Sequence, residues 1–169
     1  MNLVGQDHIV VGNEEHKVDI FRRGDARKFK TLDIEYMRYS LVVDNYLFIG
    51  TEEKMIYLVD ASTFQILDRM MTSNYVFTMC RIDGSTICCG EYQGHVDVIR
   101  VRNHKLIKVH QARLLTGNVY KIIKTDRVDE FCFGCGNGMY FSTFEGDKFV
   151  LGDDKIFSGK YVTQITLLP

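Results

Sequence analysis

The chain has 169 residues, of which 46% are hydrophobic and 25% are charged, and its formal net charge at pH 7 is -1. This composition is that of an ordinary globular domain and excludes disordered and fibrous proteins. The near-neutral charge argues against a strongly basic surface for binding nucleic acid or an anionic membrane in bulk. We therefore expect one globular domain spanning residues 1–169.

No apolar run approaches the ~20 residues that a membrane-spanning helix requires, and residues 1–16 lack the charged and apolar regions of a signal peptide. The five cysteines, an odd number, agree with a reducing compartment in which thiols pack as small hydrophobic side chains. We therefore expect an intracellular, cytoplasmic protein that needs no disulfide.

The first unit, approximately residues 1–35, is rich in strand signals. An apolar run from His8 to Val11 is followed by a polar turn that opens at Gly12. Residues 17–21 then alternate between polar and apolar, which is the period of a half-buried strand. We predict a hairpin here, followed by a third strand around residues 27–32.

The same design recurs three times, in units of approximately residues 36–74, 75–117 and 118–160. The third unit contains Thr86 to Arg100, a short apolar strand, a glycine-bearing turn and a strand of alternating character. Asp83-Gly84 and Asn137-Gly138 are hairpin dipeptides, because glycine tolerates positive φ at no steric cost. A period near 40 residues with four strands per period is typical of β-propeller blades.

The segments IYLVD (residues 56–60), ICCGEYQGHVDVIR (87–100) and FCFGCGNGMYFSTF (131–144) resemble the WD-repeat family. The chain departs from that family in having no Trp and in lacking the residues of its hydrogen-bonded tetrad, so we class it as a degenerate member. The resemblance implies an all-β propeller of four-stranded antiparallel blades, about four of them in this chain. It also implies a face that binds peptides or proteins.

The two ends of the chain predict how the ring closes. The first unit almost lacks a leading strand, whereas residues 161–169 supply a leading strand with nothing after it. A propeller uses such an offset to pair one end of the chain into the blade at the other end. Three arrangements remain open: a closed ring of four blades, a larger ring shared by two chains, and a longer propeller of which this is a part. The third is favoured.

In the WD-repeat family, which this chain resembles, the turn after the second strand and the residues ahead of the leading strand share one face. The residues of this chain that map there are mostly aromatic or acidic: Tyr36, Arg38, Tyr75, Phe77, Asn118, Tyr120, Tyr161, Thr163, Glu14, Glu15, Glu52, Glu53 and Glu91. Tyrosines beside carboxylates suit a partner that contains Lys or Arg. The alternative is that the tyrosines cap the blade cores and the glutamates are solvated turn residues.

A basic run between Arg100 and Arg127 could bind an acidic or phosphorylated partner, although the charged residues of outer strands face solvent in any case. No aromatic stacking platform accompanies it, so we do not expect nucleic-acid binding. Cys132 and Cys135 have zinc-like spacing, but they lie with Cys88 and Cys89 in apolar strands without a histidine, which favours core packing.

We predict a non-catalytic scaffold that presents a rigid propeller face to a peptide or protein partner, without a cofactor or metal. One alternative is a targeting or oligomerisation domain of a larger protein, of the kinase or ubiquitin-ligase type. The other is a propeller enzyme with a site in its central funnel. The leading strands carry Thr78, Cys80, Lys121, Gln164 and Thr166, which do not form a catalytic set.

Overall fold

The computed structural model describes residues 2–4, 7–24 and 27–166. Within these ranges the chain is all-β, with four antiparallel sheets of four strands each, as predicted. Strands that follow one another along the chain are neighbours in their sheet. The one helical segment in the described ranges is a 3-10 turn, η1 (Tyr92–Gly94).

Each sheet is built from one of the four successive parts of the chain. The first contains β1 (Asn2–Val4), β2 (His8–Gly12), β3 (Val18–Arg22) and β4 (Lys28–Leu32). The second contains β5 (Met37–Val43), β6 (Tyr46–Thr51), β7 (Met55–Asp60) and β8 (Ile66–Met71). The third contains β9 (Val76–Arg81), β10 (Thr86–Glu91), β11 (His95–Arg102) and β12 (Lys105–Arg113). The fourth contains β13 (Val119–Lys124), β14 (Glu130–Cys135), β15 (Gly138–Glu145) and β16 (Lys148–Ile156).

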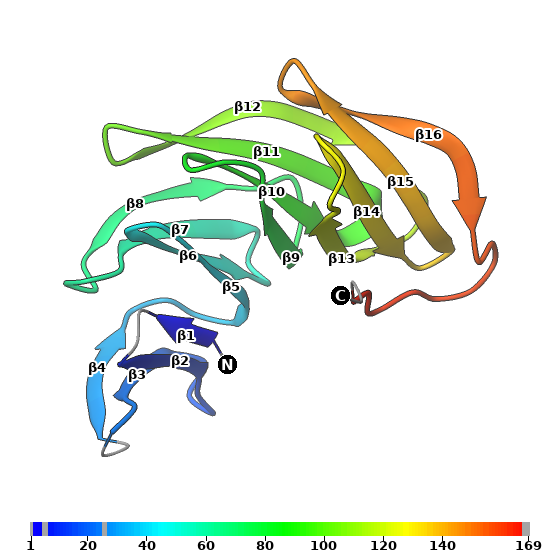
Figure 1. Ribbon diagram of the computed structural model, residues 1–169. Coiled ribbons are helices and arrows are strands. Elements are labelled where there is room, and N and C mark those ends of the chain that lie inside the picture. Colours follow the sequence, from blue (N-terminus) through cyan, green and yellow to red (C-terminus); the bar gives the residue numbers. More distant parts are fainter. Residues whose placement is uncertain (1, 5–6, 25–26, 167–169) are drawn as a thin grey trace.

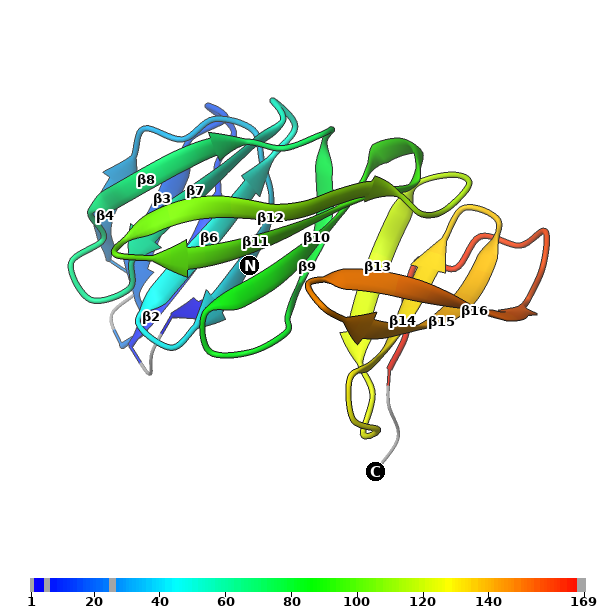
Figure 2. The ribbon, with the colours of Figure 1, turned by 90° about the horizontal axis from the view of Figure 1, so that it is seen from above.

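The sheets follow one another along an arc (Figure 1). The first strand of each sheet, β1, β5, β9 or β13, lies on the concave side, and the fourth strand lies on the outer side. Figure 2 shows the same order from above, with the first two sheets stacked at one end and the fourth sheet at the other. The inner strands hold the arc together, because β9 packs against both β5 and β13.

A hydrophobic core layer fills the space between each pair of adjacent sheets. Strand β6 contributes to two of these layers: Leu47 and Ile49 belong to the layer shared with the first sheet, and Phe48 to the layer shared with the third. Burial on both faces explains why the middle strands are continuously apolar, whereas strands with one wet face alternate. The outer strands β4 and β8 have largely exposed or half-buried side chains.

A glycine near the end of the second strand allows each sheet to approach the next. A Cβ atom on Gly50 would lie 2.5 Å from Cγ1 of Val76, and one on Gly90 would lie 2.6 Å from Cγ1 of Val119. Both valines begin the inner strand of the following sheet. The first sheet is looser at this position, because Gly12 faces Met37 at an ordinary contact distance of 3.7 Å.

The structure corrects the predictions for the two ends. The first sheet has an inner strand of its own, β1, which pairs with β2, so the prediction that this strand is nearly absent was wrong. Residues 161–166 are not assigned to a strand, and the remainder of the predicted closing segment lies outside the described residues. Val162 nevertheless donates its N–H to the carbonyl of Cys135, at 3.0 Å. A Cβ on Gly134 would lie 2.7 Å from the carbonyl oxygen of Val162, so this valine packs as Val76 and Val119 do.

We expect Gly90→Ala to destabilise the protein by about 2 kcal/mol, because the added methyl group collides with Val119 and with Thr78 beside it. Gly12→Ala is the matched control at the same repeat position, and its effect should stay within about 0.5 kcal/mol. Urea unfolding of both variants measures the difference. Equal stability of the two variants would show that the close approach does not limit the packing.

Candidate functional site

The residues ahead of the inner strands are fastened to the turns that follow the second strands. Three backbone hydrogen bonds repeat this contact: the N–H of Glu52 to the carbonyl of Tyr36 (3.0 Å), Tyr92 to Tyr75 (3.0 Å), and Gly136 to Asn118 (3.0 Å). The same edge of the second, third and fourth sheets therefore carries a repeated set of side chains. We call this edge, together with Tyr161 and the turn after β2, the tyrosine face.

An aromatic row crosses the third and fourth sheets on the tyrosine face. The ring centroid of Phe77 lies 6.4 Å from that of Tyr92 and 5.5 Å from that of Tyr120, and Tyr75 lies 5.7 Å from Tyr92. Tyr75 and Tyr92 are 40% and 37% exposed, while Phe77 and Tyr120 are half-buried. Asn118 supports the row by donating its side-chain N–H to the Tyr120 hydroxyl, at 3.1 Å.

Two cations of the chain lie on the aromatic row. The guanidinium of Arg38 lies 5.4 Å from the ring centroid of Phe77, and its Nε is 2.6 Å from a carboxylate oxygen of Glu52. The ammonium of Lys54 lies 5.7 Å from the ring centroid of Tyr75. The structure thus brings together Arg38, Glu52, Tyr75, Phe77 and Tyr120, which the sequence analysis had assigned to one face. Tyr92 joins them from η1 and was missed, because nothing in its local sequence distinguishes it from other turn residues.

The remaining predicted residues lie apart from this row. Tyr36 stacks on His16, with ring centroids 4.4 Å apart, beside a polar cavity of about 180 Å³ between the first and second sheets. Tyr161 is 75% exposed and lies next to Gly136. Thr163 is exposed as well, and so are the three turn glutamates that lie apart from the row: Glu14, Glu15 and Glu53.

Glu91 is buried, so its predicted place on the binding face was wrong. Its side chain is fully buried, and its Oε2 accepts a hydrogen bond from the backbone N–H of Asn74. Asp97 lies beside it and is also fully buried. Asp97 accepts hydrogen bonds from the N–H and the hydroxyl of Ser73, and it forms an ion pair with Lys108 at 2.6 Å. Burial and the neighbouring charge of Asp97 raise the pKa of Glu91 to about 9. Glu91 is therefore a neutral acid at pH 7.

A sequence signal for such buried acids does exist. Asp19 is the second residue of β3 and Asp97 the third residue of β11, and each lies within an apolar segment, VDI and VDV respectively. Asp19 is also buried and accepts hydrogen bonds from Asn13 (3.0 Å) and Thr31 (2.6 Å). An acid inside an apolar strand indicates a buried, hydrogen-bonded carboxylate, because an unpaired one would be costly.

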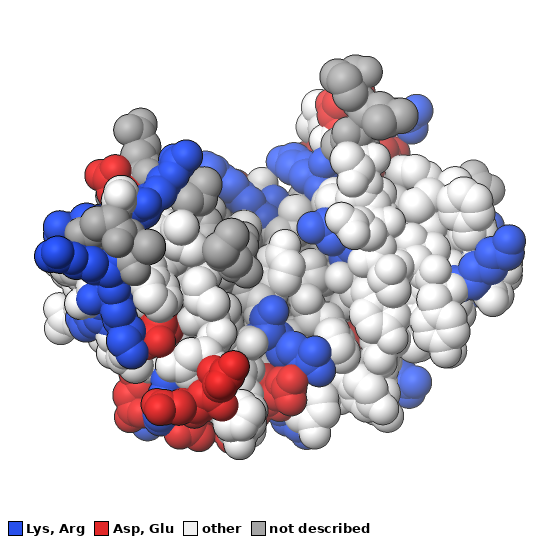
Figure 3. All heavy atoms as spheres, turned by 90° about the horizontal axis from the view of Figure 1, so that it is seen from below, with Lys and Arg blue, Asp and Glu red and all other residues white. Residues whose placement is uncertain are grey.

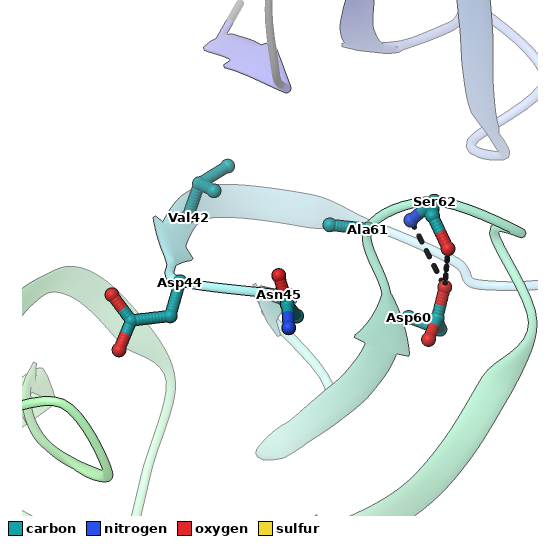
Figure 4. Close-up of a pocket in the computed structure, with 6 residues that line it drawn as sticks. All are labelled: Val42, Asp44, Asn45, Asp60, Ala61 and Ser62. Atoms are coloured by element: carbon teal, nitrogen blue, oxygen red, sulfur yellow. Dashed lines mark hydrogen bonds between the residues drawn. The ribbon is translucent and has the colours of Figure 1, made fainter.

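A larger cavity, of about 440 Å³, lies where β5 and β7 end, at the edge of the second sheet away from the tyrosine face (Figure 4). Its two carboxylates already have partners. Asp60 accepts hydrogen bonds from the backbone and hydroxyl of Ser62 and of Thr63, which lower its pKa to about 2. Asp44 pairs with Arg81 at 3.2 Å. These groups stabilise turns and a surface contact between sheets, and neither is placed as a general acid or base.

The cysteines that were weighed as metal ligands lie mainly in the core, and half of the basic run is paired within the chain. Cys88, Cys89 and Cys132 pack in the core, as predicted. In the described part of the chain, no group of three or more His, Cys, Asp and Glu residues is placed to hold a metal ion. Four of the eight cations of the basic run pair with acids of the chain: Arg100 with Asp147, Lys105 with Asp68, Lys108 with Asp97, and Arg127 with Glu130.

Comparison with known proteins identifies the fold alone. No model of a protein family matches the chain, and no curated protein matches it. A solved structure, that of the computationally designed Ika8 protein, is similar with a TM-score of 0.78 at 12% sequence identity. The match covers 99% of this chain and 52% of that chain, so this chain spans about half its length. None of the described residues forms a helix with the length and apolar character needed to cross a bilayer.

We expect Glu91→Gln to remove a pH dependence of stability. Glu91 binds a proton in the folded state up to pH about 9, whereas in the unfolded chain it ionises near its usual pKa of 4.5. The contribution of Glu91 to the free energy of unfolding is therefore complete below about pH 4.5. It is lost as the pH rises toward 9, by at most about 1.4 kcal/mol per pH unit. Glutamine resembles the neutral acid and should be the more stable variant at high pH.

Urea unfolding at about pH 5 and at about pH 8 tests this expectation, since the two proteins should diverge only at the higher pH. Glu53→Gln, which changes an exposed carboxylate, is the control and should follow the wild type. Parallel pH profiles for the wild type and Glu91→Gln would contradict the assignment of a buried neutral acid.

Proposed function

We propose that the four sheets are blades of a β-propeller and that the chain is a non-catalytic scaffold that binds a protein or peptide on the tyrosine face. The order of the sheets, with the first strand of each on the concave side, supports the propeller assignment (Figure 1). A designed structure of about twice the length shares the fold of this chain. The packing of Val162 against the fourth sheet resembles the start of a further blade, which favours a ring of more than four.

The exposed aromatic row is the observation that carries the binding proposal. Tyr75 and Tyr92 present large, rigid surfaces to solvent at the junction of two sheets, and the half-buried rings of Phe77 and Tyr120 fix their positions. Tyrosines of this kind are enriched among residues that dominate binding energy, because they bury a large area at a small entropic cost. A row that crosses two sheets also has the extended shape of a peptide site.

Contacts that the chain makes on the row itself favour a basic partner. Acidic side chains gather at the lower left in the view of Figure 3, whereas the right half of that view is mostly uncharged. Arg38 shows the chemistry of recognition within the chain, since it lies over the Phe77 ring and pairs with Glu52. A partner arginine or lysine would make the same two contacts, attraction to the ring and a charge-assisted hydrogen bond to a carboxylate.

The buried acids support a non-catalytic role. Glu91, whose pKa is raised to about 9, lies beside Asp97, and both are closed off from solvent in the third sheet. A catalytic acid has to contact its substrate, so this pair serves the interior of the sheet instead.

We expect Tyr92→Ala to weaken binding of a fluorescein-labelled peptide of Arg-Ala repeats by about 5- to 30-fold, the loss of about 1–2 kcal/mol that an aromatic contact residue contributes. Phe29→Ala removes an aromatic ring of similar exposure from β4 on the outer side, and it should leave the affinity unchanged. Fluorescence anisotropy measures both affinities. Equal affinities for Tyr92→Ala and the wild type would exclude the aromatic row as the binding site.

We expect Arg38→Ala to strengthen binding of the same peptide, because it frees the Phe77 ring and the Glu52 carboxylate for a cation of the partner. Arg38→Ala with Glu52→Gln is the control, since it leaves the ring free but removes the charge, and it should lose most of the gain. A weaker affinity for Arg38→Ala would contradict this prediction, because it would show that the arginine supports the binding site and does not compete with a cation of the partner.

A further inference from the structure

Cys80 and Cys88 lie directly opposite each other on the neighbouring strands β9 and β10. The Cα atoms of opposite residues in an antiparallel pair are about 4.5–5.5 Å apart, within the range of about 4.4–6.8 Å that a disulfide spans. Both side chains belong to the core layer between the third and fourth sheets, so they point to the same side. Both are free thiols in this structure.

The surroundings of Cys80 favour the thiolate, which is the reactive form of cysteine. The neighbouring Cys88 thiol is the largest cause of the lowered pKa of Cys80. Burial opposes this effect, and contact with the N–H of Lys124 and the charges of Lys121 and Lys124 lower the pKa further. The Lys124 ammonium is held close by, since it donates to the carbonyl of Ile82 at 3.1 Å. Cys80 is also partly exposed, so a small reagent can reach it.

The other cysteines lack this combination. Cys89 faces the core layer between the second and third sheets and lies opposite Met79. Cys132 and Cys135 lie opposite Ile123 and Val119, and residues three apart on a strand point to opposite faces. Burial raises the pKa of both thiols, that of Cys132 to about 11.

We propose that Cys80 and Cys88 form a reversible redox site that a hydroperoxide oxidises to a disulfide across β9 and β10. The Cys80 thiolate attacks one oxygen of hydrogen peroxide, the O–O bond breaks, and hydroxide leaves to become water, which converts Cys80 to a sulfenic acid. The sulfur of Cys88 then attacks the Cys80 sulfur. The S–S bond forms, the S–O bond breaks, and the hydroxide leaves as water with the Cys88 proton. Two electrons pass from the two thiols to one peroxide, and a dithiol reductant reverses the change.

The disulfide would join β10 to β9, a strand that contributes to the tyrosine face. β9 packs against both β5 and β13, and it carries Phe77 of the aromatic row. Oxidation therefore joins this central inner strand to its neighbour in the same sheet. The proposal needs no change in backbone position beyond what opposite residues already provide.

Treatment of the reduced protein with hydrogen peroxide, followed by alkylation and tryptic digestion without reductant, tests this proposal. Trypsin cuts after Arg81, so Cys80 and Cys88 fall in separate peptides, residues 70–81 and 82–100. We expect these peptides to be joined, free thiols to fall from five to three, and dithiothreitol to restore all five. Cys80 carrying sulfinic acid without any joined peptide would overturn the proposal.

Matched variants assign the second sulfur. The joined peptides should persist in Cys89→Ser and disappear in Cys80→Ser and Cys88→Ser; loss in Cys89→Ser alone would assign the bond to Cys89 and overturn the proposal. If Cys88→Ser does not fold, fragmentation of the joined wild-type peptides distinguishes Cys88 from Cys89. Lys121→Gln should slow alkylation of Cys80 at neutral pH by roughly threefold, because it removes a charge that favours the thiolate. An unchanged rate would show that this lysine does not activate Cys80.

Discussion

The absence of a side chain at one repeated position controls how the sheets of this protein pack. Gly50 and Gly90 allow the valine that begins the next inner strand to come closer than any Cβ atom would permit. That contact and the backbone hydrogen bonds beside it set the spacing of successive sheets. Because Tyr75 and Asn118 immediately precede these valines, the same packing fixes the side chains of the tyrosine face. The scaffold and its surface therefore depend on one constraint.

The third sheet combines several properties that its neighbours do not share. It contains the neutral acid Glu91 beside Asp97, the opposed thiols Cys80 and Cys88, and the exposed Tyr92 of η1. At the position of Glu91, the other sheets carry Asn13, Thr51 and Cys135, whose shorter side chains hydrogen-bond within or beside their own turns. A longer acid cannot form the same short contact, and it reaches instead to the backbone ahead of β9. Where the other sheets have a turn residue, the third sheet thus has a glutamate that links it to the segment from the second sheet.

Only some of the residues that were predicted to share one face lie together. Tyr75, Phe77, Tyr120, Arg38 and Glu52 were assigned to it from their repeat positions, and the structure brings them together. The repeat could not reveal that Arg38 already lies between Phe77 and Glu52, since its contact with Phe77 joins the second sheet to the third. Nor could it place Glu91, because a glutamate after a strand is solvated in most turns and is buried here by packing from the preceding segment.

The sequence by itself determined the local structure. Alternating and continuous apolar runs, glycine turns and a period near 40 residues predicted four antiparallel sheets of four strands, since each signal acts over a few neighbouring residues. It did not find β1, which is only three residues long and too short to show a period. Tertiary structure alone decided which groups meet. Across sheets, the Arg38 guanidinium meets the Phe77 ring and the Lys124 ammonium meets the Ile82 carbonyl; within the third sheet, Glu91 meets Asp97. The last pair lies close in the sequence, but its burial, and with it the protonation of Glu91, results from how the sheets stack.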